Sequence, residues 1–209
     1  AIKNQLRAIL RSLAITAPRE AGRLWSKKGQ SWLAKVELAE AEALERDLLT
    51  EEMNEVNGKI QRVEKGLAKI ADRHPAVTLL RTIPGVGIRT AEAFVAYVDD
   101  PGRFARSIQV GVYFGLVPCQ DSSAQVNRLG HITREGPATV RKLLCEAAWQ
   151  AIRRSPTVRG WFERISGNKP EGRKIALVAV ARKLAVVMGA MMRGGEVWQE
   201  NHQQNHQTL

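Results

Sequence analysis

Two adjacent serines, Ser122 and Ser123, lie in the polar stretch VPCQDSSAQVNRLGHITREGP, which runs from Val117 to Pro137. A serine hydroxyl is a weak nucleophile until a base or a metal activates it. His131 is the only histidine nearby, and no G-x-S-x-G nucleophile elbow of a serine hydrolase is present. Such a composition is also typical of an ordinary turn. The residues alone therefore leave two interpretations open: a polar loop, or a serine that does chemistry.

Positive charge is concentrated in the same part of the chain. Of the 209 residues, those from 1 to 101 include 16 Lys and Arg against 14 Asp and Glu, whereas those from 102 to 193 include 16 against 5. The formal net charge of +11 comes almost wholly from the second region. A one-sided positive field suits a polyanion, because neutralising its phosphates releases counterions. We therefore favour a nucleic-acid partner over a merely solvated basic surface.

A long amphipathic helix is predicted ahead of this region. Apolar residues recur without a miss at spacings of four and three, at Leu49, Met53, Val56, Ile60, Val63, Leu67 and Ile70. Such a repeat, flanked by Glu and by Lys or Arg, is typical of a coiled coil or of a long helical hairpin. Gly58 and Gly66 lie off the repeat and weaken the helix by about 1 kcal/mol each relative to alanine. We expect pairing to offset this cost, which makes the arm a scaffold and an interface.

A glycine-rich turn is predicted between two helices in the segment LLRTIPGVGIRTAEAFVAYV (79–98). The pattern resembles a helix-hairpin-helix motif, in which glycines permit a tight turn and let a phosphate approach backbone amides. The expected contact residues are Arg81, Gly85, Gly87, Arg89 and Thr90. Such a motif contacts the nucleic-acid backbone and does not read sequence. A plain glycine turn between packed helices remains the alternative.

The predicted fold is mainly α, with a long coiled-coil-like helical arm followed by a compact helical domain that contains the helix-hairpin-helix motif. We expect the arm over 1–75, the compact domain over 76–195 and a disordered polar tail over 196–209. The apolar stretch RKIALVAVARKLAVVMGAMMRGG (173–195) is expected to form a helix buried along most of its length.

The sequence also argues against several classes of protein. Cys119 and Cys145 show no metal-ligand spacing, which predicts no zinc site, no disulfide framework and reduced thiols. We expect no membrane span and no signal peptide, and hence a cytoplasmic location. The chain begins at Ala1 with a helical pattern already running. We therefore expect it to be a piece of a longer protein.

Several of these segments together resemble a known family. The stretches IPGVGIRTAEAFVAYV, FARSIQVGVYFGLVPCQDSSA, RLGHITREGPATVRKLLCEAAWQA and ARKLAVVMGAMMRGG occur in this order. The chain resembles the carboxy-terminal part of insertion sequence 110 family transposases (the IS116/IS110/IS902 type), the bridge-RNA-guided recombinases. The resemblance covers nearly the whole chain and is most specific over 79–195.

The resemblance implies a composite enzyme. In this family an amino-terminal RNase H-like domain holds magnesium with four acidic residues, and a helical carboxy-terminal domain supplies a serine that attacks DNA. A structured guide RNA, the bridge RNA, pairs with target and donor DNA, and the helical arm supports dimers and tetramers. The acidic domain is absent from this chain. We therefore expect magnesium in that missing domain, no cofactor in the chain itself, and nucleic-acid binding without catalysis by the chain alone.

The family's serine lies a few residues after a GL-x-P element, commonly as the second of a Ser-Ser pair followed by glycine. Carried onto this chain, that position is Ser123, five residues after Pro118, and Ser122 is the second choice. Ala124 stands where glycine is usual and narrows the backbone choices of the loop.

Basic residues around the serines and on a later helix are the expected phosphate contacts. They are Arg128, His131, Arg134, Arg141, Lys142, Arg173 and Lys174. For His131 we favour a structural or phosphate-contacting role over catalysis, because no partner for it is visible. The alternative function is a non-catalytic nucleic-acid-binding helix-hairpin-helix module on a coiled-coil oligomerisation arm.

Overall fold

The computed structural model describes residues 1–123, 126–167 and 169–200, and describes only the backbone over 120–123 and 126–129. The chain divides into two compact units, Ala1–Leu67 and Ala68–Leu209. The division falls inside one long helix, α3 (Glu40–Ala71), whereas the sequence suggested a boundary near residue 75. Each unit has an apolar core of its own.

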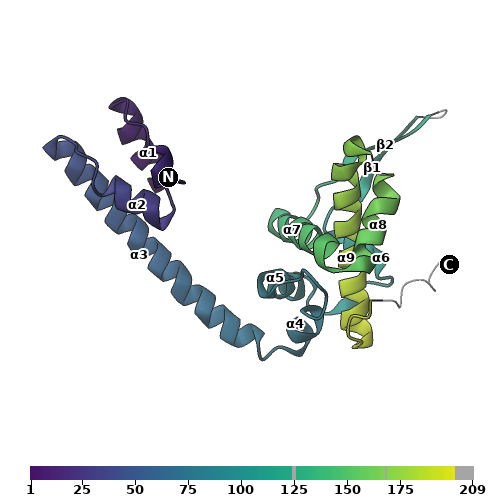
Figure 1. Ribbon diagram of the computed structural model, residues 1–209. Helices are drawn as coiled ribbons and strands as arrows, with labels where there is room; N and C mark the ends of the chain where they lie inside the picture. Colours follow the sequence, from purple (N-terminus) through teal and green to yellow (C-terminus); the bar gives the residue numbers. More distant parts are fainter. Residues whose placement is uncertain (124–125, 168, 201–209) are drawn as a thin grey trace. The chain divides into compact units, whose positions relative to one another are not determined.

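The fold is mainly α, which confirms the prediction (Figure 1). The first unit contains α1 (Ile2–Ser12), the 3-10 turn η1 (Arg19–Ala21), α2 (Lys27–Leu33) and most of α3. The second contains α4 (Pro75–Leu80), α5 (Ile88–Val98), η2 (Pro101–Arg103), α6 (Ile108–Tyr113), β1 (Pro118–Ser123), β2 (Val126–Ile132), α7 (Ala138–Arg154), α8 (Pro156–Ser166), η3 (Pro170–Gly172) and α9 (Arg173–Gly194). The two strands form one antiparallel sheet.

The core of the first unit joins α1, α2 and the first half of α3. It is built on Leu6, Leu10, Leu33 and Met53, which are all nearly inaccessible to solvent. Arg46 of α3 is also buried, and its Nη1 donates a hydrogen bond of 2.9 Å to the carbonyl of Val36, just beyond α2. A buried guanidinium of this kind satisfies carbonyls that a helix end leaves unpaired.

The long amphipathic helix predicted within the arm is one continuous helix of 32 residues, α3. Its apolar repeat is covered only at its start, where Met53 is 3% exposed. Beyond that point the repeat is open to solvent, with exposed fractions of 39% for Val56, 49% for Ile60, 62% for Val63, 47% for Leu67 and 67% for Ile70. We call Val56, Ile60, Val63 and Leu67 the apolar stripe of α3. The described residues of the first unit provide no helix that packs on it.

Helix α9 is the centre of the second unit. It contacts α4, α6, α7 and α8, and Figure 1 shows it running through the middle of this unit. Its innermost side chains are all inaccessible: Ala176, Val180, Ala181, Leu184, Ala185 and Met188. Gly189 allows α6 to approach closely, since a Cβ there would lie 2.9 Å from Cγ2 of Val110. Buried residues recur along this helix from Ala176 to Met191, with partly exposed residues between them.

The segment that ends in α9 is also long and apolar enough to cross a membrane. Pro170–Gly194 contains an 18-residue window with a mean hydropathy of 1.9. Half of that window is buried inside the protein. The core helix of a folded domain has the same composition, and its packing against four other helices accounts for the apolar residues.

The chain continues past α9 along the surface of the second unit. The rings of Trp198 and Trp161 meet edge to face, with centroids 6.0 Å apart, and the N–H of Trp198 donates to Oγ1 of Thr82 at 3.0 Å. These contacts hold residues 196–200 against α8 and the α4–α5 turn. The rest of the predicted tail, 201–209, lies outside the described residues.

Glu200 is the last described residue of this segment, and it lies at the start of α8. Its carboxylate accepts hydrogen bonds from the Ser155 hydroxyl at 2.9 Å and from the N–H of Thr157 at 3.3 Å. Burial favours the neutral acid, but the hydrogen bonds from Ser155, Thr157 and Trp198 outweigh it and lower the pKa of Glu200. A carboxylate at this place caps the first turn of α8.

The central position of α9 makes a prediction about stability. Leu184 is 0% exposed, so Leu184→Ala leaves a cavity and is expected to lower the free energy of unfolding by about 2–5 kcal/mol. Ile175→Ala on the same helix is the matched control, because Ile175 is 72% exposed and its truncation should cost about 0.5 kcal/mol or less. Urea unfolding followed by circular dichroism measures both. Equal losses for the two variants would contradict the central position of α9.

Candidate functional site

The serine stretch, which the sequence suggested as a loop, forms a β-hairpin. Strands β1 and β2 pair antiparallel, with Ser122 opposite Asn127 and Ser123 opposite Val126. The two serines are thus the last residues of β1. Figure 1 shows the hairpin projecting away from the helices of the second unit. The side chains of both serines, and that of Arg128 on β2, lie outside the described ones.

The two ends of the hairpin meet in direct backbone contact. Gly115 (φ +63°) and Gly136 (φ +73°) both take left-handed conformations, which glycine adopts without steric cost. A Cβ on Gly115 would lie 2.2 Å from the carbonyl oxygen of Glu135, and one on Gly136 would lie 2.2 Å from that of Tyr113. We call this contact the glycine clasp. It leaves no room for a side chain at either glycine.

Arg141 of α7 stabilises the glycine clasp through hydrogen bonds. Its Nη1 donates to three carbonyl oxygens: that of Phe114 at 3.3 Å, that of Glu135 at 2.6 Å and that of Gly136 at 2.9 Å. These carbonyls belong to both ends of the hairpin. The contact gives Arg141 a structural role in fixing the hairpin base, and its expected contact with a phosphate stays a prediction.

The other cations predicted around the serines have more accessible side chains. His131 is exposed on β2, and Arg134 is exposed at the hairpin base with a left-handed backbone (φ +58°). Lys142 is exposed on α7, where its Nζ lies 3.9 Å from the carboxylate of Glu146. The structure therefore brings His131 and Arg134 to the hairpin and its base, and places Lys142 on the helix that follows.

The predicted helix-hairpin-helix residues lie around the turn between α4 and α5. Arg81 pairs with Asp72 at 3.0 Å, and Arg89 pairs with Glu92 at 2.9 Å. Thr90 is only 7% exposed, so its hydroxyl faces the interior and not a ligand. Two helices flank the glycine turn as expected. A nucleic-acid contact by this turn stays a prediction, and the two arginines already have acidic neighbours.

The two glycines of the turn have different roles. Gly85 has a φ of +94°, and a Cβ there would lie 2.4 Å from the backbone nitrogen of Ala151. Its missing side chain therefore lets the turn pack against the backbone of α7. Gly87, at the start of α5, has open space around it and an ordinary φ of −86°. Only Gly87 leaves room for a phosphate to approach.

Arginines that the sequence did not single out surround Arg173, at the start of α9. Arg153, Arg159 and Arg173 line a cavity of about 380 Å³ between α7, α8 and α9. Arg153 stacks on Trp149 at 5.6 Å, and Arg173 stacks on Phe162 at the same distance. The Trp149-to-Arg153 spacing of four residues on a helix was the available signal. Lys174 is exposed beside this cluster.

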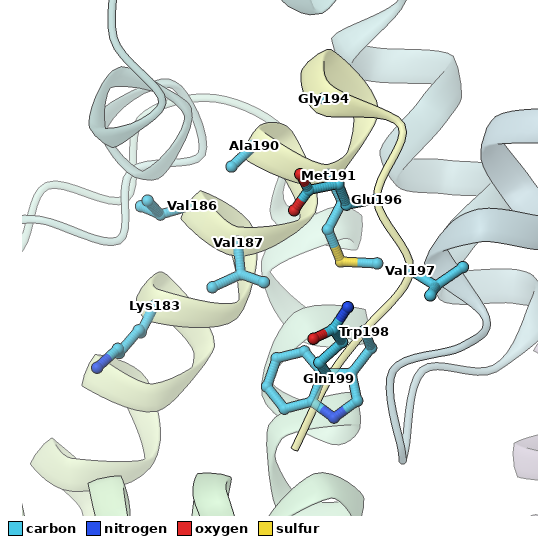
Figure 2. A pocket seen from close by; sticks show the side chains of 10 residues that line it. All are labelled: Lys183, Val186, Val187, Ala190, Met191, Gly194, Glu196, Val197, Trp198 and Gln199. Carbon is cyan, nitrogen blue, oxygen red and sulfur yellow. The ribbon is translucent and has the colours of Figure 1, made fainter. Parts of the chain in front are cut away.

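A larger cavity of about 560 Å³ lies between the end of α9 and the segment that follows it. Figure 2 shows Met191 and Trp198 lining it, with Lys183 at one end. The Nζ of Lys183 lies 4.1 Å from the ring centroid of Trp161. Burial, and to a smaller extent the charge of Arg164, lowers the pKa of Lys183. No predicted site residue lines this mostly apolar cavity.

Metal and thiol chemistry have little basis in the part of the chain that the structure describes. That part contains no group of three or more His, Cys, Asp or Glu side chains able to hold a metal ion. Both cysteines are free thiols, and burial raises the pKa of Cys145. A raised pKa keeps the thiol protonated and unreactive.

The contrast between Gly85 and Gly87 makes a prediction about stability. Gly85→Ala should lower the free energy of unfolding by more than about 1 kcal/mol, because it combines a strained φ with a clash against α7. Gly87→Ala should stay within about 1 kcal/mol of the parent, since it meets no atom. Urea unfolding measures both, and equal effects would refute the packing role of Gly85.

Comparison with known proteins shows which proteins the chain is similar to. Residues 77–163, which include the turn, the hairpin and α7, match the Transposase IS116/IS110/IS902 family. The chain is 29% identical over 213 residues to the transposase for insertion sequence element IS1111A of Coxiella burnetii, covering 95% of this chain and 55% of that protein. It is 26% identical over 199 residues to a probable family 20 transposase of Pseudomonas aeruginosa, covering 92% and 58% respectively.

A third relative is the insertion element IS110 uncharacterized 43.6 kDa protein of Streptomyces coelicolor, 25% identical over 151 residues. That match covers 72% of this chain and 37% of the relative. The chain thus corresponds to between about a third and three fifths of the length of these three relatives. The matches confirm the resemblance inferred from the sequence: residues 77–163 match the transposase IS116/IS110/IS902 family, and transposases of insertion sequences align with most of the chain.

Proposed function

We propose that this chain is the part of a transposase that binds DNA and a guide RNA and supplies a serine nucleophile for cleaving and exchanging DNA strands. The match to a transposase family supports a general activity in DNA transposition. The observation that carries the serine is the hairpin, which ends β1 at Ser122 and Ser123 on a base fixed to the helical core. Ser123 is the proposed nucleophile, and Ser122 is the second choice.

The proposed reaction is an in-line phosphoryl transfer. The Oγ of Ser123 bonds to a DNA phosphorus while the bond from that phosphorus to a deoxyribose oxygen breaks. The serine proton passes to a base, and the departing oxygen takes up a proton. The phosphoserine ester conserves the bond energy, so that the hydroxyl of another strand rejoins the DNA by the reverse attack. Arg134, exposed at the hairpin base, supplies positive charge for the phosphate, and His131, exposed on β2, is a further phosphate contact.

Magnesium does not fit the described residues of this chain, because they contain no cluster of carboxylates to hold it. No step of the proposed reaction is therefore routed through a metal here. In the proposal, magnesium belongs to an RNase H-like domain outside this chain, and activation of the serine depends on that domain. The chain by itself is then a nucleic-acid-binding protein without catalytic activity.

The remaining partners are proposed on the same basis. A structured guide RNA would select the DNA sites, which agrees with a basic surface that contacts backbone phosphates. A homo-oligomer, either a dimer or a tetramer, would form through the apolar stripe of α3, which is long, regular and exposed. The cytoplasm, where the DNA of a bacterial cell lies, is the proposed location.

A non-catalytic nucleic-acid-binding module is the second candidate. The observation that favours it is a cluster of three arginines, Arg153, Arg159 and Arg173, which line one cavity together with Glu163. Such a cluster binds phosphate without any nucleophile. Both candidates bind nucleic acid, and they differ only in whether a serine acts as a nucleophile.

The serine hypothesis predicts a covalent protein–DNA adduct. With the amino-terminal domain, magnesium and guide RNA supplied, the parent protein should retain labelled DNA through denaturing electrophoresis. Ser123→Ala should reduce that adduct at least about 100-fold, because no other group at that position can form the ester. Ser122→Ala should retain most of it.

Ser107→Ala is the matched control, since Ser107 lies outside the hairpin and its hydroxyl caps no helix. It should form the adduct as the parent does. Full adduct and strand exchange in both hairpin variants would eliminate the serine mechanism. Intact DNA binding by a parent that forms no adduct would support the non-catalytic module.

The apolar stripe predicts an effect on assembly. Ile60→Glu combined with Leu67→Glu should lower the sedimentation mass of the chain to that of a monomer. Burying two carboxylates in a packed apolar interface costs more free energy than the apolar contact contributes. Leu44→Glu with Leu48→Glu is the control, since these residues are at least as exposed as Ile60 and Leu67 but lie about 100° or more around the helix from them. A monomeric parent, or equal effects of both pairs, would rule out the stripe as the interface.

A further inference from the structure

The first unit carries its charges in two separate regions. Residues 1–38 contain eight Lys and Arg against only Glu20 and Glu37, whereas residues 40–55 contain seven Asp and Glu against only Arg46. The near balance of the first 101 residues hides this separation. We call α1, η1 and α2, with the residues that connect them, the basic lobe. Its cations are Lys3, Arg7, Arg11, Arg19, Arg23, Lys27, Lys28 and Lys35.

The charge of the basic lobe is not neutralised within the chain. All eight cationic side chains are exposed, and none of them forms an ion pair with a described residue. The described ion pairs of the first unit, Arg46 with Asp47 and Lys59 with Glu55, both lie within α3. The acidic region of α3 therefore stays separate from the basic lobe although both belong to one small unit.

The cations of α1 form a row. Lys3, Arg7 and Arg11 follow one another at intervals of four residues, so they lie on one side of the helix at steps of about 6 Å. The Nζ of Lys3 lies 5.5 Å, and the Cζ of Arg7 lies 5.3 Å, from the ring centroid of Trp25. Trp25 packs on the core of the unit, so the row has a rigid support.

The same tryptophan connects this row to further cations. Lys27 and Lys28 begin α2 only two and three residues after Trp25, and both are exposed. Cations of α1 thus lie over the ring of Trp25, and two further cations follow that residue closely in the sequence. Lys3 and Arg7 already occupy the ring face, so Trp25 supports the cations instead of offering a surface for stacking a base.

We propose that the basic lobe is a second nucleic-acid-binding surface, which holds the sugar-phosphate backbone by charge and does not read sequence. It lies outside residues 77–163, the part that matches the transposase family, and it belongs to the first unit, whereas the serine hairpin belongs to the second. The inference rests on the proposed function only in taking nucleic acid as the partner. Lys and Arg side chains that point into solvent bind a polyanion through phosphate contacts and counterion release.

The acidic region of α3 in a second copy of the chain is the rival partner. Two observations favour nucleic acid over it. The acidic residues spread over a broad sector of α3, whereas the cations of α1 form a single row that suits a line of phosphates. In addition, this acidic region forms no ion pair with the basic lobe of its own chain.

The salt dependence of binding tests the proposal. In the variant Arg11→Gln, Lys27→Gln, Lys28→Gln, three exposed cations that do not contact Trp25 lose their charge. The control Lys59→Gln, Lys65→Gln, Lys69→Gln removes the same charge from exposed positions of α3. Fluorescence anisotropy of the full chain with a labelled duplex DNA, and separately with a single-stranded RNA, both of random sequence, gives affinity as a function of salt concentration.

Each lost phosphate contact should reduce the slope of log K against log salt by about 0.9 for duplex DNA and about 0.7 for a single strand. We expect the basic-lobe variant to reduce the slope by about 2–3 on at least one probe, and the α3 variant by less than 1. The probe that responds identifies which nucleic acid occupies the lobe.

The outcomes separate this inference from the proposed function. Binding by the parent with the same slope in both variants would overturn the basic lobe alone. A lower sedimentation mass of the basic-lobe variant at an unchanged slope would assign the lobe to the second copy, and would also overturn the proposal. A parent that binds neither probe at low salt would overturn the proposed nucleic-acid function as well.

Discussion

The second unit depends on burying helix α9 on several sides at once. An apolar helix of this length is stable in water only if neighbours cover most of its surface, and each fully buried large apolar side chain contributes about 1.5–3 kcal/mol. Four helices meet on it, and small residues such as Ala181 and Gly189 determine how near they come. The same requirement explains why a core helix has the composition of a membrane span. Because α9 and its neighbouring helices bury one another's apolar surface, the core does not need the hairpin to cover it, and the hairpin projects from this core.

Many arginines of this basic protein stabilise the fold by donating hydrogen bonds to backbone carbonyls. Arg141 donates to carbonyls at the hairpin base, and Arg159 donates to the last carbonyls of α7. Arg193 reaches carbonyls of the η2 turn, and Arg46 reaches the end of α2. A guanidinium carries five donors and no acceptor, so it can satisfy several carbonyls that helix ends and turns leave unpaired. Net charge therefore overstates the number of cations available to a polyanion. The cations of the basic lobe differ, because they are exposed and form no ion pair with a described carboxylate, and two of them, Lys3 and Arg7, lie over the ring of Trp25.

The sequence predicts those features that depend on short-range periodicity. The spacing of apolar residues predicts the long helix of the arm, the apolar helix of the core and the two helices around the glycine turn. The roles of Gly85 and Arg141 do not, because each depends on a partner far along the chain: Ala151 for the glycine, and Phe114 for the arginine. Arg141 and Lys142 look equivalent in the sequence, yet one is bound to carbonyls and the other is exposed. The hairpin escaped notice because its strands are polar and lack the alternation of a half-buried sheet.

The glycine clasp also separates what is fixed in this fold from what is free to vary. Among the described residues, the contacts that join the hairpin to the helices lie at its base, between residues 113–117 and 132–141. Paired residues added to both strands beyond that base would lengthen the hairpin without disturbing the core, whereas a side chain on either glycine would separate its two ends. Evolution can therefore tune the reach of the serine-bearing hairpin independently of the stability of the domain that carries it.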